Sequence, residues 1–153
     1  MRLLKLILIF LVINFGALAI GTLLMANGPQ TAWYISLNKA PWTPPGWVFG
    51  AAWTTIMVCF SIYMALLSSI LSTPKVIGLF SIQFVLNVIW NYIFFNQHLI
   101  GLGLLCILLL TTVVSIFLYD FRNILKLKTL LILPYFIWLC IATSLNMYIL
   151  IHN

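Results

Sequence analysis

The sequence predicts an all-α polytopic membrane protein, a single domain built as a bundle of five transmembrane helices. Composition is the first reason: 65% of the 153 residues are hydrophobic and 5% are charged, whereas soluble domains carry about 25% charged residues. The second reason is that the apolar residues form long continuous runs rather than alternating with polar ones. Because lipid cannot satisfy backbone polar groups, such runs favour helices over a barrel.

The first run, about 3–24, starts like a signal peptide but is longer than the roughly 7–15 residues of a signal's apolar region. We therefore expect a retained first helix. Asn14, Ala17 and Gly21 fall on one face of it, three and four residues apart. The small residues predict close approach of another helix. Dimerisation through the same face is the alternative.

The connection over 25–43 is the longest in the chain and is too apolar for a free loop. It contains Trp33, Tyr34 and Lys39. Aromatic residues of this kind gather where membrane meets water. We expect this first loop to cap a pocket between the helices.

The second helix is expected over about 44–68. Thr43 is a candidate N-cap, and prolines at the first helical positions, here Pro44 and Pro45, cost no hydrogen bond. Trp53 lies in the first half of this helix.

The third helix, about 76–95, carries the most informative polar pattern. Its amide side chains recur every four residues and share one face, with two aromatic residues beside them: Gln83, Asn87, Asn91, Trp90 and Phe94. An amide that faces lipid is unfavourable, so this face should point into the bundle. Hydrogen bonds between helices, worth about 0.6 kcal/mol each, are one explanation; the lining of a cavity, which we favour, is the other.

Two further helices complete the bundle. The fourth, about 99–119, is rich in Leu and has the weakest functional signal. The fifth, about 129–151, contains Pro134, which predicts a kink near its start. Four residues share one face of this last helix: Tyr135, Trp138, Ala142 and Asn146.

The cations indicate topology. Five spans place six of them on one side of the membrane: Arg2, Lys5, Lys75, Arg122, Lys126 and Lys128. Only Lys39 lies on the other side. The positive-inside rule then predicts a cytoplasmic N-terminus, with the first loop periplasmic if the protein lies in a bacterial cell membrane. The net charge of +6 reflects this topology, and we expect no nucleic-acid partner.

The sequence offers little for ionic catalysis. Asp120 is the only acidic residue and lies at a helix end, which argues against proton-coupled transport through the membrane. His98 and His152 could in principle ligate haem iron, but we favour a position at the polar boundary of the membrane for both and predict no metal site.

The three cysteines lie within apolar runs and predict no disulfide framework. We expect no obligatory cofactor.

Tryptophans from three helices, Trp53, Trp90 and Trp138, remain as the candidate site. An interfacial belt would explain each of them alone. It would not explain why they share faces with Gln83, Asn87 and Asn146. Indoles beside amides suit a large, flat, apolar ligand with a few polar groups.

Three motifs, in order along almost the whole chain, carry a resemblance to a known family. The first comprises Trp33-Tyr34, Leu37, Lys39, Trp42, Pro44-Pro45, Phe49 and Trp53; the second Gln83, Leu86-Asn87, Trp90 and Phe94-Phe95; the third Pro134-Tyr135, Trp138, Ala142 and Leu145-Asn146. Together they resemble the TspO/MBR family of tryptophan-rich sensory proteins, which is related to the mitochondrial translocator protein, the peripheral benzodiazepine receptor.

The resemblance implies a homodimer of five-helix subunits whose pocket, closed by the first loop, binds porphyrins such as protoporphyrin IX or a haem-like molecule. By motif, the pocket residues would be Trp33, Tyr34, Trp53, Asn87, Trp90, Phe94, Trp138 and Ala142. Lys39, Gln83, Tyr135 and Asn146 complete the set that we expect to bind ligand.

Three functions stay open. We favour a membrane receptor or sensor for porphyrins and related flat hydrophobic ligands. The resemblance also allows a light-dependent porphyrin-degrading enzyme, for which Trp53 and Trp138 would be the catalytic candidates. The third alternative is a transporter of tetrapyrroles or lipids.

Overall fold

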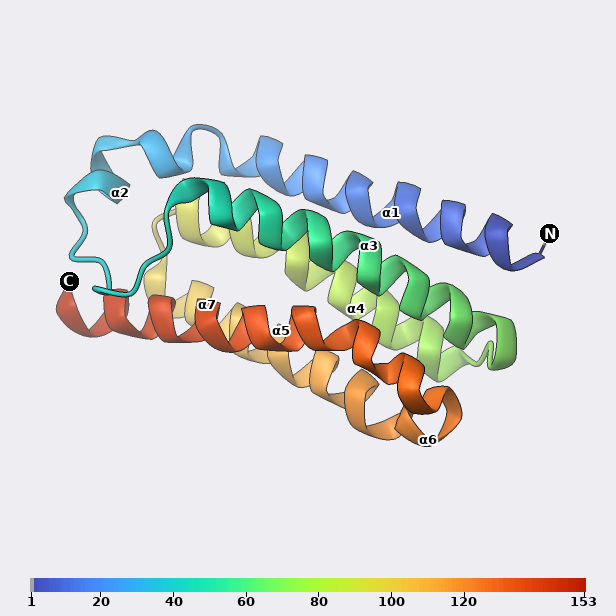
Figure 1. Ribbon diagram of the computed structural model, residues 1–153. Helices are drawn as coiled ribbons and strands as arrows, with labels where there is room; N and C mark the ends of the chain where they lie inside the picture. Colours follow the sequence, from blue (N-terminus) through green and yellow to red (C-terminus); the bar gives the residue numbers. More distant parts are fainter. Residues whose placement is uncertain (1) are drawn as a thin grey trace.

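The computed structural model describes residues 2–153 and contains helices and loops, with no strand in that range. Five helical segments are long and apolar enough to cross a membrane: Arg2–Gln30, Gly46–Ile70, Pro74–Asn96, Ile100–Asp120 and Arg122–His152. The expected all-α bundle with five spans is therefore confirmed. The two ends of the chain lie at opposite ends of the bundle (Figure 1).

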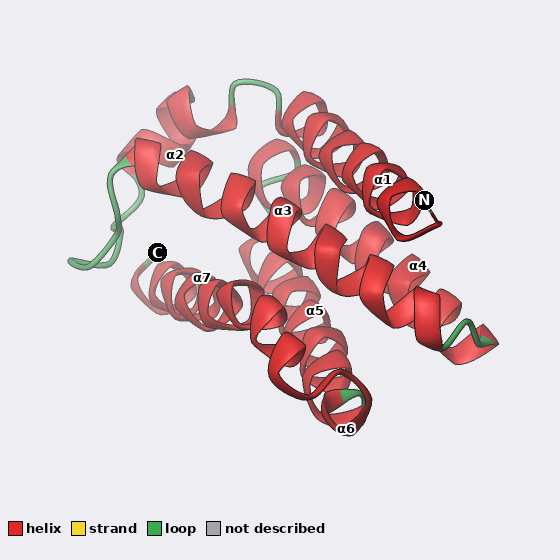
Figure 2. Cartoon of the chain, turned by 45° about the vertical axis from the view of Figure 1, so that its right-hand side comes forward, coloured by secondary structure: helices red, strands yellow, loops and turns green. Residues whose placement is uncertain are grey.

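The elements follow in the order α1 (Arg2–Met25), a 3₁₀ turn (Gly28–Gln30), α2 (Ala32–Ser36), α3 (Gly46–Ile70), α4 (Pro74–Asn91), a π-helical turn (Tyr92–Asn96), α5 (Ile100–Asp120), α6 (Arg122–Leu125), a 3₁₀ segment (Lys126–Ile132) and α7 (Leu133–His152). The first loop, residues 26–45, passes from the end of α1 toward the end of α7 and back to the start of α3 (Figures 1 and 2). We call this end of the bundle the loop end.

The small-residue face of α1 packs inside the chain. The buried residues of α1 are Asn14, Ala17 and Gly21. Asn14 donates a hydrogen bond of 2.8 Å to the Ser61 hydroxyl on α3. A Cβ on Gly21 would lie 2.7 Å from the Asn91 amide nitrogen on α4. The face is thus used for helix packing within one chain and is not free for a second copy.

The start of α3 differs from the prediction. Its N-cap is Pro45, whose backbone is extended, while the Thr43 hydroxyl donates to the carbonyl of Ala40 at 2.7 Å. Helical backbone angles are unfavourable for a residue that directly precedes proline. The second proline therefore disfavours a helical Pro44, and the helix begins two residues later than expected, at Gly46.

Two other helices also begin differently. α4 starts at Pro74 because the Thr73 hydroxyl accepts a hydrogen bond from the amide of Val76 at 3.4 Å. α7 starts at Leu133, after the 3₁₀ segment, so Pro134 occupies its first turn and does not kink it. Proline is tolerated there because its missing N–H has no partner in a first turn.

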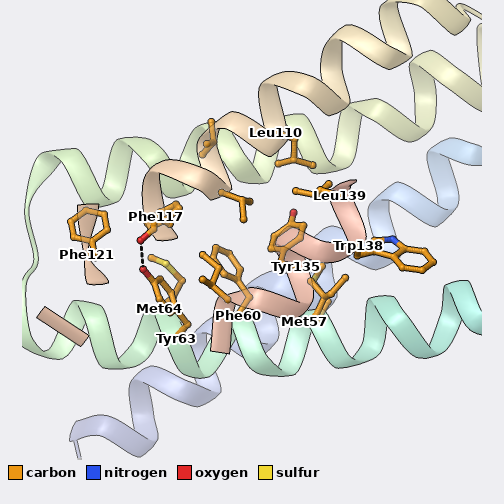
Figure 3. Close-up of a cluster of buried hydrophobic side chains, with 14 of the residues drawn as sticks. Met57, Phe60, Tyr63, Met64, Leu110, Phe117, Phe121, Tyr135, Trp138 and Leu139 are labelled. Carbon is orange, nitrogen blue, oxygen red and sulfur yellow. Dashed lines mark hydrogen bonds between the residues drawn. The ribbon is translucent and has the colours of Figure 1, made fainter. Parts of the chain in front are cut away.

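A core of buried side chains joins α3, α5 and α7 away from the loop end. Phe60 contacts Tyr135 edge to face, with ring centroids 5.3 Å apart. The Tyr63 hydroxyl donates to the Phe117 carbonyl at 2.7 Å. Figure 3 shows this aromatic core, with Trp138 set apart at its edge. The core fixes the helices at one end and leaves room between them at the other.

Candidate functional site

A cavity of about 600 Å³ lies between the helices at the loop end. Residues predicted for the site line it from the first loop, α3, α4 and α7: Tyr34, Lys39, Trp53, Asn87, Trp90, Trp138 and Ala142. Indoles from three helices therefore surround a single hollow, together with the Asn87 and Asn91 amides of α4. Whether these side chains bind a ligand stays a prediction.

Asn87 supplies the central polar group of the cavity wall. The residue is 5% exposed, and its side chain makes no hydrogen bond within residues 2–153, while its backbone carbonyl accepts one from the Asn91 side-chain amide at 3.3 Å. The Trp90 indole nitrogen is also buried without a partner in that range. Buried polar groups are normally paired. Both groups therefore have hydrogen-bonding capacity that the described chain leaves unused.

The first loop brings one positive charge to the cavity. The Lys39 ammonium donates to the carbonyls of Tyr34 at 2.8 Å and Ile35 at 3.2 Å. It also lies 4.8 Å from the centre of the Tyr34 ring. The single acidic side chain of the chain, Asp120, pairs with Lys75 at 2.7 Å instead. Lys39 thus keeps an uncompensated charge beside the cavity.

Tyr34 contributes a neutral hydroxyl. Burial raises the pKa of this phenol above its ordinary value, because desolvation disfavours the phenolate. The side chain therefore remains a hydrogen-bond donor at neutral pH.

The loop is tied to the end of α7 by paired amides. The backbone N–H of Asn38 donates to the side-chain oxygen of Asn153 at 2.9 Å, and the Asn153 amide donates back to the Asn38 carbonyl at 3.3 Å. Further along, the Trp42 indole donates to the Ser144 hydroxyl at 3.2 Å. We call these contacts the latch. They hold the loop over the cavity.

The remaining predicted residues lie around the cavity without lining it. Gln83 donates to the Tyr135 hydroxyl at 2.8 Å, so this pair forms an interhelical hydrogen bond, the alternative explanation of the polar face. Phe94 stacks behind Trp90, with ring centroids 5.4 Å apart. These side chains support the wall.

Three other residues named from the sequence, Trp33, Asn146 and His152, are also absent from the cavity lining. Trp33 stacks on the ring of His98, with centroids 4.0 Å apart. Asn146 donates to the Ala142 carbonyl at 3.1 Å within α7. His152 contacts the Tyr148 carbonyl through its Nδ1 atom. Residues 2–153 contain no cluster of three His, Cys, Asp or Glu side chains suited to a metal ion.

Sequence reasoning missed the wall formed by α1 and the start of α3. Leu18 and Thr22 on α1 line the cavity together with Gly46, Gly50 and Thr54 on α3. The four-residue spacing of the last three could have revealed them. The contacts of the latch had no comparable signal, because its partners are ordinary polar residues far apart in sequence.

Comparisons with known proteins agree with the motifs. Residues 7–152 match the sequence model of the TspO/MBR family. Protein CrtK of Rhodobacter capsulatus is 36% identical over 119 residues, covering 75% of this chain and 74% of its own. The tryptophan-rich protein TspO of Archaeoglobus fulgidus is 33% identical over 159 aligned residues, covering 100% and 99%.

The human translocator protein is 31% identical over 125 residues, covering 78% of this chain and 74% of its own. The family match extends over nearly all of the chain, covering four of the five apolar spans in full and the first from residue 7 on. The protein is therefore a multi-pass integral membrane protein that belongs to the TspO/MBR family.

Proposed function

We propose that the protein is a membrane receptor or sensor that binds porphyrins, such as protoporphyrin IX, and related flat hydrophobic ligands in the cavity. The observation that carries the proposal is the convergence of Trp53, Trp90 and Trp138 with the unpaired Asn87 amide around one hollow. A relative in Cereibacter sphaeroides, 28% identical, is named a tryptophan-rich sensory protein, which supports the sensory role.

The size and chemistry of the cavity support this ligand class. Small-molecule sites are typically hollows of about 300–1,000 Å³ with apolar walls and a few polar groups, and the cavity of about 600 Å³ falls within that range. Indole faces pack favourably on flat aromatic systems. Asn87 then supplies a donor and an acceptor for a polar edge of the ligand.

Lys39 would set the orientation of the ligand. Its ammonium is unpaired with any carboxylate of the chain and is held beside the cavity by two loop carbonyls. A propionate of a porphyrin would form a charge-assisted hydrogen bond with it. The macrocycle would then extend from the loop toward the indoles.

The direct test removes the indoles one at a time. Trp53→Ala and Trp138→Ala should each weaken protoporphyrin IX binding by about 1–3 kcal/mol, because each variant loses a large buried contact. Binding is measured by quenching of intrinsic tryptophan fluorescence.

Trp47→Ala is the matched control, since Trp47 is 74% exposed and does not line the cavity. Equal affinities in all four proteins would refute this site.

Light-dependent degradation of the bound porphyrin is a second candidate, because two oxidisable indoles, Trp53 and Trp138, face the same cavity. Turnover of porphyrin under light and dioxygen that is lost in a Trp53→Phe, Trp138→Phe variant would favour this enzyme. A transporter of tetrapyrroles or lipids would instead move ligand across sealed vesicles.

We also propose that the chain forms a homodimer, as the resemblance to the family implies.

We propose further that the protein lies in a bacterial cell membrane, with its N-terminus cytoplasmic and the first loop periplasmic. The distribution of charge supports this topology. The start of α1, the α3–α4 junction and α6 lie together at the end opposite the loop (Figure 1). All cations except Lys39 belong to these segments and the following 3₁₀ segment.

A further inference from the structure

The cavity has an open side between α1 and α3. Gly46, Gly50 and Thr54 lie four residues apart on one face of α3, line the cavity, and are all exposed. A Cβ placed on Gly46 or Gly50 would meet no atom within 4 Å. The two glycines therefore border empty space that connects the cavity with the surface of the bundle.

The rim of this opening is compatible with lipid. Thr22, the exposed rim residue of α1, donates its hydroxyl to the carbonyl of Leu18 at 2.8 Å. On the facing helix, Thr54 donates to the carbonyl of Gly50 at 2.9 Å. Because both hydroxyls are satisfied within their own helices, the rim presents methyl groups and glycine backbone to the bilayer. An apolar molecule would pass it without displacing a hydrogen bond.

The opening has a defined floor. Nearer the middle of the bundle, Asn14 on α1 bonds to Ser61 on α3 at 2.8 Å and joins the two helices. The gap is therefore confined to their loop-end halves, within segments apolar enough to span the membrane.

Two other routes into the cavity are obstructed. Between α3 and α7, Trp138 packs edge to face on Phe49, with centroids 5.2 Å apart. Over the top, the latch from Asn38 to Asn153 holds the loop in place. Entry from water would require these hydrogen bonds to break, whereas entry between α1 and α3 would not.

We propose that the gap between α1 and α3, bordered by Gly46 and Gly50, is a lateral entrance through which flat apolar ligands reach the cavity directly from the bilayer. This inference rests on the proposed ligand-binding function. Such ligands partition into hydrocarbon, so the bilayer is their local source. Glycine at both positions keeps the passage wide enough for a planar molecule.

The test uses the substitution Gly50→Leu, whose side chain should narrow the entrance. The side chain has room at its base, and leucine is a better helix former than glycine, so the fold should be retained. In vesicles loaded with protoporphyrin IX, stopped-flow tryptophan quenching should show association slowed about tenfold and dissociation no faster than in the unmodified protein. A side chain that merely filled the cavity would instead weaken affinity and accelerate dissociation.

Two variants complete the design. Gly16→Leu is the matched control, because Gly16 on α1 also borders open space but does not line the cavity; its rates should equal those of the unmodified protein. Asn153→Ala removes the Asn38–Asn153 amide pair of the latch and should leave the rates unchanged.

Unaltered rates in Gly50→Leu, weakened affinity with faster dissociation in that variant, or faster association in Asn153→Ala would each overturn the lateral entrance while the proposed binding function stands. Absence of any quenching in the unmodified protein would overturn the binding function and the entrance together.

Discussion

Asn87 and Gln83 occupy one face of α4, one helical turn apart, but differ in their hydrogen bonding. Gln83 is bonded to the Tyr135 hydroxyl, whereas the Asn87 amide has no partner within the described chain and borders the cavity. An amide without a partner gains no hydrogen bond on folding and keeps its donor and acceptor free. We therefore predict that Gln83 acts in stability and Asn87 in ligand recognition.

Replacing each amide by leucine exposes that difference. Asn87→Leu should weaken protoporphyrin IX binding by about 0.5–1.5 kcal/mol through the lost hydrogen bond while leaving thermal stability equal or higher. Gln83→Leu should lower stability by about 0.6 kcal/mol, because it breaks a bond between helices, with little change in affinity. Fluorescence titration and thermal unfolding in detergent measure the two effects. Identical behaviour of the two variants would contradict this division.

The sequence could indicate which face of α4 matters but not which amide bonds to which partner. Four-residue spacing identifies a shared face. The pairing of Gln83 with Tyr135 depends on how α4 and α7 cross, and that is set by the aromatic core. For the same reason Phe94 and Asn146 were predicted as ligand contacts but lie behind the wall.

At the scale of elements, the short segments that frame the cavity are the hardest to predict. The 3₁₀ turn that follows α1 packs directly on the π-helical turn that follows α4: a Cβ on Gly28 would lie 2.6 Å from the Cβ of Phe95. Phe95 itself lines the cavity. This close contact sets the position of the first loop over the bundle.

Gly28→Ala should therefore disturb the cavity. The added methyl cannot fit without moving a turn, so we expect a stability loss of about 1–3 kcal/mol and weaker porphyrin binding. Thermal unfolding and tryptophan quenching report the two effects. Gly16→Ala, where space is open, should show neither, and a Gly28→Ala protein equal to it would count against the contact.

The length of the apolar runs was enough to predict the long helices. Most of their ends can be predicted from local rules on capping residues and prolines. Thr73 before Pro74 is a recognisable start. The start at Gly46 follows from the restriction that Pro45 places on Pro44, a rule applicable to the sequence alone. The π-helical turn Tyr92–Asn96 has no such local signal, because it arises where the end of α4 meets its neighbours.

For the whole molecule, the structure combines a closed aromatic core at one end with a hollow at the other. Charge follows the same axis, since Lys39 alone lies at the loop end among the cations of the chain. This asymmetry predicts orientation in the membrane.

Thiol labelling tests that orientation. In a variant without Cys59, Cys106 and Cys140, Asn27→Cys should react with an impermeant reagent in intact cells, because the proposed topology places the first loop outside. Lys128→Cys should react only after permeabilisation. The reverse pattern would invert the topology and leave the fold intact.

The central claim is that the hollow at the loop end holds the ligand. It is tested most directly by an experimental structure of the protein with protoporphyrin IX. We predict ligand density between Trp53, Asn87 and Trp138, with a carboxylate directed toward Lys39. Density only on the lipid-facing surface of the helices, with the hollow vacant, would contradict the account.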